Sequence, residues 1–309
     1  MIKKIIIILA VFLAGCTSNK TLKHPLDKSK SKTVVLENGL KVYLLSDPSF
    51  NVSAASVSVE VGSLDNPDDR QGLAHFLEHM LFLGTEKYPD VDEYSSYLKT
   101  YGGYSNAYTA SDHTNYQFQV LPDGFEGALD RFSQFFISPL FTEEYTAREV
   151  NAVNSEHQKN MLNDNWRQFR ISSLFAKEGH PERKFGTGNL ETLGDITREE
   201  LIRFYKQHYS ANRMGVALLS THSLEEMEGW CRQYFSSVKN RNLNRNKYDP
   251  NFLEKKETFR LIQIDPVKDV RNLNLLFSLP ATRHLYKSKP GRQFGFILGY
   301  EGKGSLLSY

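Results

Sequence analysis

The sequence predicts an α+β fold in which helices pack on one face of a mostly antiparallel sheet. Short β-branched runs separated by turn residues occur near residues 33–45 and 52–61. Stretches with apolar residues at helical spacing follow and alternate with further strand-like runs up to residue 235. With 309 residues, of which 40% are hydrophobic, the chain can bury a sizeable core in two domains.

The first folded elements are predicted to be a hairpin and a longer strand. Two strands, 33–36 and 40–45, flank Asn38-Gly39, which favours a type I′ turn. A helix is expected around 73–82, and a second helix at 92–101 ends at two glycines. Further strands are expected at 104–109, 114–121 and 214–219, and further helices at 124–136, 143–162, 164–176, 198–208 and 223–235.

The chain after residue 238 is expected to lead into a second domain. Residues 241–256 are basic and rich in asparagine, which is typical of a linker. Strands are expected at 258–264 and 273–279 and a helix at 293–300, so 257–309 would be an incomplete second domain. Its strand–strand opening is similar to that near residue 33, which suggests that a second copy of the first domain, 33–240, begins there.

The N-terminal segment has the pattern of an export signal. Lys3 and Lys4 precede an apolar run at 5–14, which is too short for a transmembrane helix and suits a signal peptide over residues 1–15. The run ends in Leu-Ala-Gly-Cys, which resembles a bacterial lipoprotein box and marks Cys16 for lipidation. The alternative is an ordinary secretory signal that happens to contain a cysteine.

The residues that follow the signal are expected to form a tether. Residues 16–32 are polar and rich in lysine and serine, which is typical of a flexible segment. Thr17 after the cysteine favours an outer-membrane lipoprotein that faces the periplasm. If Cys16 carries lipid, the one remaining cysteine, Cys231, has no intrachain disulfide partner and is expected to be a buried small hydrophobe.

The first predicted helix carries His75-x-x-Glu78-His79. Residues i and i+4 lie one turn apart on the same helix face, so the two imidazoles can meet at one point. Two imidazoles suit zinc, which they bind at about 2.0–2.1 Å, and a nearby carboxylate can serve as a general base. A chance match is the alternative, although the order of the residues is the inverted form of the His-Glu-x-x-His zinc motif.

A catalytic zinc needs a third protein ligand, and the helix after residue 141 offers several. Glu143, Glu144, Glu149 and Glu156 all lie on it. Glu149 and Glu156 are two turns apart and share one face. Spacing alone does not choose among these glutamates, because most glutamates on surface helices are simply solvated.

Beyond this pattern, the chain resembles the insulinase–pitrilysin family of zinc metallopeptidases, peptidase family M16, from about residue 33 onward. The resemblance includes a ligand glutamate that follows the second histidine by 77 residues, as Glu156 follows His79. Matching segments are Gly72-Leu73-Ala74-His75, Met80-Leu81-Phe82-Leu83-Gly84-Thr85, Ser105-Asn106-Ala107-Tyr108-Thr109, Ser155-Glu156-His157, Lys184-Phe185-Gly186-Thr187-Gly188-Asn189 and, near the end, Glu301-Gly302 followed by Gly304-Ser305-Leu306-Leu307.

The resemblance implies a role for each matching residue. His75, His79 and Glu156 would hold one Zn²⁺ per chain. Glu78 would be the general base and would pass its proton to the leaving amine. Glu149 would not bind the metal but would orient the imidazole of one of the histidine ligands.

The resemblance also implies a substrate and an architecture. Asn106 and Ala107 match a strand edge that pairs with the substrate backbone by strand addition. Residues 33–240 would be the catalytic domain, with zinc-dependent endopeptidase activity on unfolded peptides. The family also uses a C-terminal half that supplies an arginine and a tyrosine, and no residue here matches them. We therefore expect a C-terminal half or a second chain as partner.

Two other functions remain open from the sequence. One is a non-catalytic or weakly active fragment that serves as a scaffold subunit, as in relatives that lose site residues. The other is a lipid-anchored module that binds peptides without cutting them. The net charge of +2 gives no support to a nucleic-acid partner, so none is expected.

Overall fold

The computed structural model of the protein describes residues 23–253, 261–277, 279–280 and 282–308. Its centre is a six-stranded sheet, and all neighbouring strands are antiparallel except β2 and β6. The strands in spatial order are β1 (Lys30–Val35), β2 (Lys41–Ser46), β6 (Met214–Ser220), β3 (Ser53–Val59), β5 (Thr114–Val120) and β4 (Tyr104–Thr109). The predicted fold class, helices on a mostly antiparallel sheet, is confirmed.

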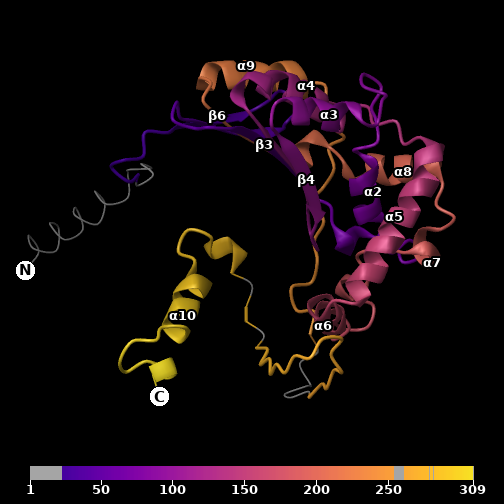
Figure 1. Cartoon of the computed structure of the whole chain (residues 1–309), viewed down its shortest axis with the longest axis vertical. Helices are drawn as coiled ribbons and strands as arrows, with labels where there is room; N and C mark the ends of the chain where they lie inside the picture. The colour runs from indigo at the N-terminus through magenta and orange to yellow at the C-terminus, as the bar shows by residue number, and fades with distance from the viewer. Residues whose placement is uncertain (1–22, 254–260, 278, 281, 309) are drawn as a thin grey trace, which may run out of the picture.

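Helices cover one face of the sheet and gather beyond its β4 end (Figure 1). Helix α9 packs on β1 and β2, α4 on β3 and β5, and α2 on β4. The α-helices are α2 (Leu73–Met80), α3 (Glu93–Thr100), α4 (Phe125–Gln134), α5 (Glu143–Met161), α6 (Asp164–Ser173), α7 (Leu190–Leu193), α8 (Arg198–His208), α9 (Leu224–Phe235) and α10 (Pro290–Leu298). Short 3₁₀ helices lie at Ser63–Asp65, Pro122–Gly124, Pro181–Arg183, Ala211–Arg213, Arg283–Leu285 and Leu306–Ser308.

The core lies between the sheet and these helices. Alternate residues of β3 and β5 are buried, as expected for strands with one covered face. Aromatic rings fill the space between the sheet and α4, where Phe118 meets Phe132 edge to face at 5.1 Å between ring centroids. Buried Tyr116 and Tyr209 join strand and helix layers through a 2.6 Å hydrogen bond between their hydroxyls.

The predicted type I′ turn at Asn38-Gly39 is wrong. A two-residue turn at Asn38-Gly39 would pair Val35 with Val42, but Val35 pairs with Lys41. The loop between β1 and β2 is therefore longer than two residues. Gly39 alone has a positive φ there, at +83°, whereas a type I′ turn requires two such residues. The Asn38 amide instead donates to the carbonyl oxygens of Phe235 and Val238, both at 2.9 Å. A contact with the end of α9 thus overrides the local turn preference.

The strands predicted at 258–264 and 273–279 do not form within the described part of these segments, 261–264, 273–277 and 279. A strand needs a neighbour to pair its backbone N–H and C=O groups, and the described chain supplies none for these residues. The predicted helix at 293–300 is present, shifted slightly, as α10, and none of its residues is buried. Residues 254–260 lie outside the described residues.

The segment predicted as a linker, 241–256, is irregular where it is described. It lies against the segment that follows α6, around residues 176 and 177. The Lys177 amide donates to the Phe252 carbonyl at 2.7 Å, and Lys177 also pairs with Asp249 at 3.2 Å. Among the helices of the described residues, none combines the length and apolar character needed to cross a membrane.

Candidate metal centre

Helix α2 carries the two histidines and is anchored by its apolar face. Leu73, Phe76, Leu77 and Met80 are all at most 2% exposed. Their burial orients the opposite edge of the helix, with the two imidazoles, toward a cavity. Gly72 begins the helix with φ +93°, a left-handed conformation that glycine adopts without strain.

The ring of His75 is held by the main chain of a distant loop. Its Nδ1 lies 2.8 Å from the Thr187 carbonyl oxygen, which can only accept, so Nδ1 carries the proton and Nε2 is free to bind a metal. The loop reaches this position because two glycines touch: a Cβ on Gly72 would lie 2.3 Å from the Cα of Gly188. Burial is the main cause that lowers the pKa of His75, which favours the neutral ligand form.

The ring of His79 is held by a carboxylate. Its Nδ1 lies 2.7 Å from Glu149 Oε1 on α5, so its Nε2 also faces the cavity. Burial lowers the pKa of His79, but the hydrogen bond from its ring to Glu149 and the negative charges of Glu149, Glu78 and Glu156 together raise the pKa overall. A carboxylate in this position makes the imidazole a better metal ligand once a metal replaces the second proton.

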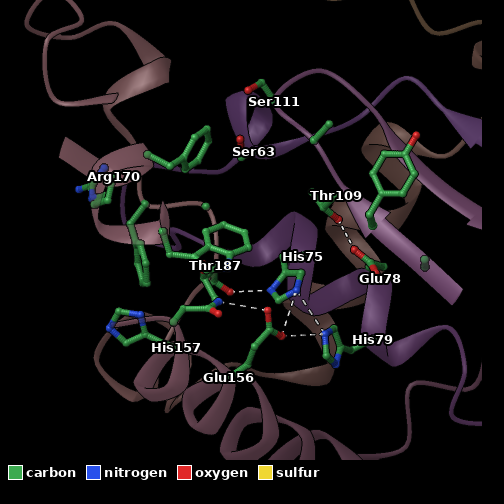
Figure 2. Close-up of a pocket in the computed structure, with 18 of the residues that line it drawn as sticks. Ser63, His75, Glu78, His79, Thr109, Ser111, Glu156, His157, Arg170 and Thr187 are labelled. Atoms are coloured by element: carbon green, nitrogen blue, oxygen red, sulfur yellow. Dashed lines mark hydrogen bonds and ion pairs between the residues drawn. The ribbon is translucent and has the colours of Figure 1, made fainter. Parts of the chain in front are cut away.

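Three ligand atoms converge at one point (Figure 2). Glu156 Oε2 lies 3.5 Å from His75 Nε2 and 3.7 Å from His79 Nε2, and the two Nε2 atoms are 3.3 Å apart. Ligand atoms about 2.0–2.1 Å from a tetrahedral zinc lie roughly 3.3–3.4 Å from one another. These residues therefore have the composition and spacing of a site for a divalent metal ion.

Glu78 lies beside this point but does not join the ligand group. Its side chain is 6% exposed, and Oε2 accepts a 2.5 Å hydrogen bond from Thr109 Oγ1 on β4. Burial raises the pKa of Glu78 to about 7, and the hydrogen bond from Thr109 opposes this rise. A buried carboxyl with such a pKa is suited to exchanging protons near neutral pH.

The cavity beside the metal ligands has a volume of about 980 Å³ and is bordered by β4. This strand pairs only with β5 within the described sheet, so its other edge is unpaired. Asn106 and Ala107 lie on β4 and line the cavity, as does Tyr108. An extended peptide in the cavity can therefore reach unpaired backbone groups of β4. Trp166 and Phe169 of α6 also line the cavity.

The structure thus brings together His75, Glu78, His79, Glu149 and Glu156, with Asn106 and Ala107 along the same cavity. Cys16 lies outside the described residues. Cys231 is 1% exposed, and burial raises the pKa of its thiol to about 12.

Sequence reasoning did not identify Thr109 or Thr187 as parts of the site. Thr109 lies two residues after Ala107 on β4 and so shares its face of the strand, which is a weak signal for a place near the site. Thr187 acts through its main-chain oxygen, so its residue type carries no signal.

Two family models match the chain. The model of insulinase (peptidase family M16) matches residues 41–178. The model described as the peptidase M16 inactive domain matches residues 195–309. The first match contains His75, Glu78, His79, Glu149 and Glu156.

Similar proteins are about three times longer than this chain. Insulin-degrading enzyme of Homo sapiens is 45% identical over 297 residues, covering 94% of this chain and 29% of that protein. A-factor-processing enzyme of Saccharomyces cerevisiae is 42% identical over 295 residues, covering 93% of this chain and 29% of that protein.

A solved structure is similar as well. The crystal structure of pitrilysin superposes with a TM-score of 0.73 at 35% identity, over 77% of this chain and 26% of that one. The matched family models, the relatives over nearly the whole chain and the His-His-Glu site agree, and the chain therefore belongs to the M16, or insulinase, family of peptidases.

Proposed function

We propose that this chain is the metal-binding part of a zinc metalloendopeptidase that hydrolyses peptide bonds of unfolded peptides. The convergence of His75 Nε2, His79 Nε2 and Glu156 Oε2 carries the proposal, because it matches a three-ligand zinc site with room for water. Zinc at this site supplies Lewis acidity, which lowers the pKa of water and polarises a carbonyl group.

Glu78 is proposed as the general base. The Thr109 hydroxyl holds its carboxylate through Oε2, and the carboxylate would take a proton from the attacking water and deliver it to the leaving amine. Glu149 keeps the His79 Nδ1 proton in place, and Thr187 does the same for His75. These contacts keep both Nε2 atoms directed at the metal while Glu78 moves protons.

The substrate is proposed to bind as an added strand. Asn106 and Ala107 lie on the unpaired edge of β4, where backbone hydrogen bonds recognise an extended chain rather than one side chain. A peptide must be unfolded to present such an edge. This restricts the substrate class to unfolded peptides.

A partner half is proposed for full activity. Leu273, Leu275, Leu276 and Phe277 are each at least 69% exposed, and apolar side chains in such a group favour a covering partner. The relatives extend far beyond the length matched here, and their remaining length is a source for that cover. A scaffold or peptide-binding role without hydrolysis is the alternative if the partner is absent.

The proposed function is tested with purified chain, a quenched peptide and a metal chelator. The chain alone and the chain mixed with a C-terminal half of a relative are compared. We expect one zinc per chain in both samples and much faster chelator-sensitive hydrolysis in the mixture. Peptide binding without hydrolysis in both samples would favour the scaffold role. Full turnover by the chain alone would contradict the need for a partner.

Membrane attachment through lipid on Cys16 is proposed as well, with the chain exported to the outer membrane and facing the periplasm. The Leu-Ala-Gly-Cys sequence supports it. Replacing Cys16→Ser should move the protein out of the membrane fraction. Mass spectrometry that finds a mature N-terminus elsewhere, without lipid, would contradict the proposal.

A further inference from the structure

The cavity wall formed by α6 contains a cation without a carboxylate partner. Arg170 lines the cavity together with Trp166, Phe169 and Ile171 of the same helix. In Figure 2 it lies across the pocket from Glu78. Within the described part of the chain, no carboxylate oxygen lies within 4.0 Å of its guanidinium, since its bonds there are to Ser173, Arg183 and Lys184.

The other cations of this cavity are compensated. Arg167 pairs with Asp164 at 3.2 Å, and Lys184 pairs with Asp68 at 3.1 Å. Glu182 also lines the cavity, but it forms no ion pair with Arg170 within 4.0 Å. Arg170 is therefore the cavity-lining arginine whose charge the described residues leave unbalanced.

The guanidinium of Arg170 is held in place from one side. Its Nη1 donates to Arg183 O at 2.7 Å, to Ser173 Oγ at 3.0 Å and to Lys184 O at 3.4 Å. Nε and Nη2 have no acceptor among the described residues. A planar fork with one nitrogen anchored and two open is pre-organised for a carboxylate, which it can bind through two parallel hydrogen bonds.

The surroundings of Arg170 strengthen attraction for an anion. Burial lowers the pKa of the guanidinium, and the nearby positive charge of Arg183 lowers it further. Both effects disfavour the charged guanidinium, the first by removing water and the second by charge repulsion, and a bound anion would offset part of each. The Phe185 ring lies 5.8 Å from the guanidinium carbon and shields one side of it.

We propose that Arg170 forms a carboxylate-binding subsite in the substrate cavity and recognises either an acidic side chain or the C-terminal carboxylate of the bound peptide. The proposal rests on the proposed peptidase function for the nature of the ligand. It adds a preference that pairing with the β4 backbone cannot supply, because strand addition reads the main chain. Exposed Trp166 and Phe169 beside Arg170 would contact the apolar part of the same peptide.

Binding is measured separately from hydrolysis. The metal-loaded chain carrying Glu78→Gln is titrated with fluorescently labelled short peptides, and fluorescence anisotropy gives each Kd. In the first set of peptide pairs, one member of each pair has Gln replaced by Glu at a single position, and the position changes from pair to pair. The members of the second pair differ only in whether the C-terminus is a carboxylate or an amide. We expect the carboxylate form of at least one pair to bind about tenfold more tightly.

Two variants of Arg170 and one control identify the cause. Arg170→Gln should abolish the preference, and Arg170→Lys should retain part of it because charge remains but the fork is lost. Arg167→Gln removes one positive charge from the same helix, where Arg167 is already paired with Asp164, and should leave the tenfold preference in place. Circular dichroism and zinc content check that each variant is folded.

Each outcome is decisive. A preference in the side-chain series assigns the subsite to acidic residues, and a preference only in the second pair assigns it to the peptide terminus. Equal binding of all pairs, or a preference that survives Arg170→Gln, would overturn the proposal. With the C-terminal half of a relative present, hydrolysis by the wild-type chain without any preference would leave the peptidase function standing, whereas a preference without hydrolysis would support the subsite and count against the peptidase.

Discussion

Residues 30–238 and residues 261–308 differ sharply in what their apolar side chains contact. In the first region, Val57 and Val59 of β3 are at most 1% exposed, under helices that cover the sheet. In the second, Leu273 is 81% and Phe277 is 82% exposed. Both regions contain strand-like apolar runs, so burial depends on neighbouring strands and helices rather than on the run itself.

The same contrast separates the candidate chemistry from the rest. The three candidate metal ligands and Glu78 all come from the first region, and the contacts that orient them come from it too. Among the described residues of the second region, none lines the cavity. If this division is correct, substitutions in the first region should alter metal binding, stability and hydrolysis, and equivalent substitutions in the second should not.

The largest effect is expected for Glu78→Gln. Loss of the base should reduce hydrolysis by about 10²–10⁴-fold, with the C-terminal half present where the chain alone is too slow. Zinc content should stay the same, because Glu78 does not contribute to the ligand group. Glu301→Gln, an exposed carboxylate of the second region, is the matched control and should change neither quantity. Finding zinc lost in Glu78→Gln and retained in Glu156→Gln would reverse the assigned roles.

A core substitution should show the difference in stability between the two regions. Phe132 is fully buried, so Phe132→Ala should lower the free energy of unfolding by about 3–5 kcal/mol. Phe277→Ala should change it by no more than about 0.5 kcal/mol, because the ring is exposed. Urea unfolding followed by circular dichroism measures both. Similar losses for the two variants would mean that Phe277 is packed in solution.

Removal of the metal should affect the first region alone. Zinc at a free concentration 100 times its Kd should raise the free energy of unfolding by about 2.7 kcal/mol, and a chelator should remove that gain. Hydrogen exchange should then quicken in α2 and α5 but not in 261–308. The gain should be much smaller in Glu156→Gln. An equal response of both regions to the chelator would contradict the location of the site.

The smallest effect is expected at Thr109. Thr109→Val keeps the shape and removes the hydrogen bond to Glu78, so kcat should fall about tenfold while KM and zinc content stay near their original values. Thr109→Ser should restore most of kcat because it restores the hydroxyl. Thr282→Val in the second region serves as the control. A change in KM alone would assign Thr109 to substrate binding instead.

Much of the fold followed from the sequence because local patterns and tertiary packing agree. The strand predicted at 104–109 and the helix predicted at 198–208 have the same bounds in the structure. The latter begins with a capping pair, in which Thr197 and Glu200 each accept from the other's backbone amide. At Asn38 the prediction failed, because a contact with the end of α9 decided the loop.

The local sequence determined that His75, Glu78 and His79 lie along one edge of a helix, because the helical repeat fixes which side chains are neighbours. Only the tertiary structure decided how α5 faces that edge. It sets Glu156 Oε2 against both Nε2 atoms and Glu149 against His79 Nδ1, although the two glutamates share one face of α5. It also brought the Thr187 carbonyl to His75 through the contact of Gly72 with Gly188. Such contacts depend on the packing of segments more than 60 residues apart, which no local period encodes.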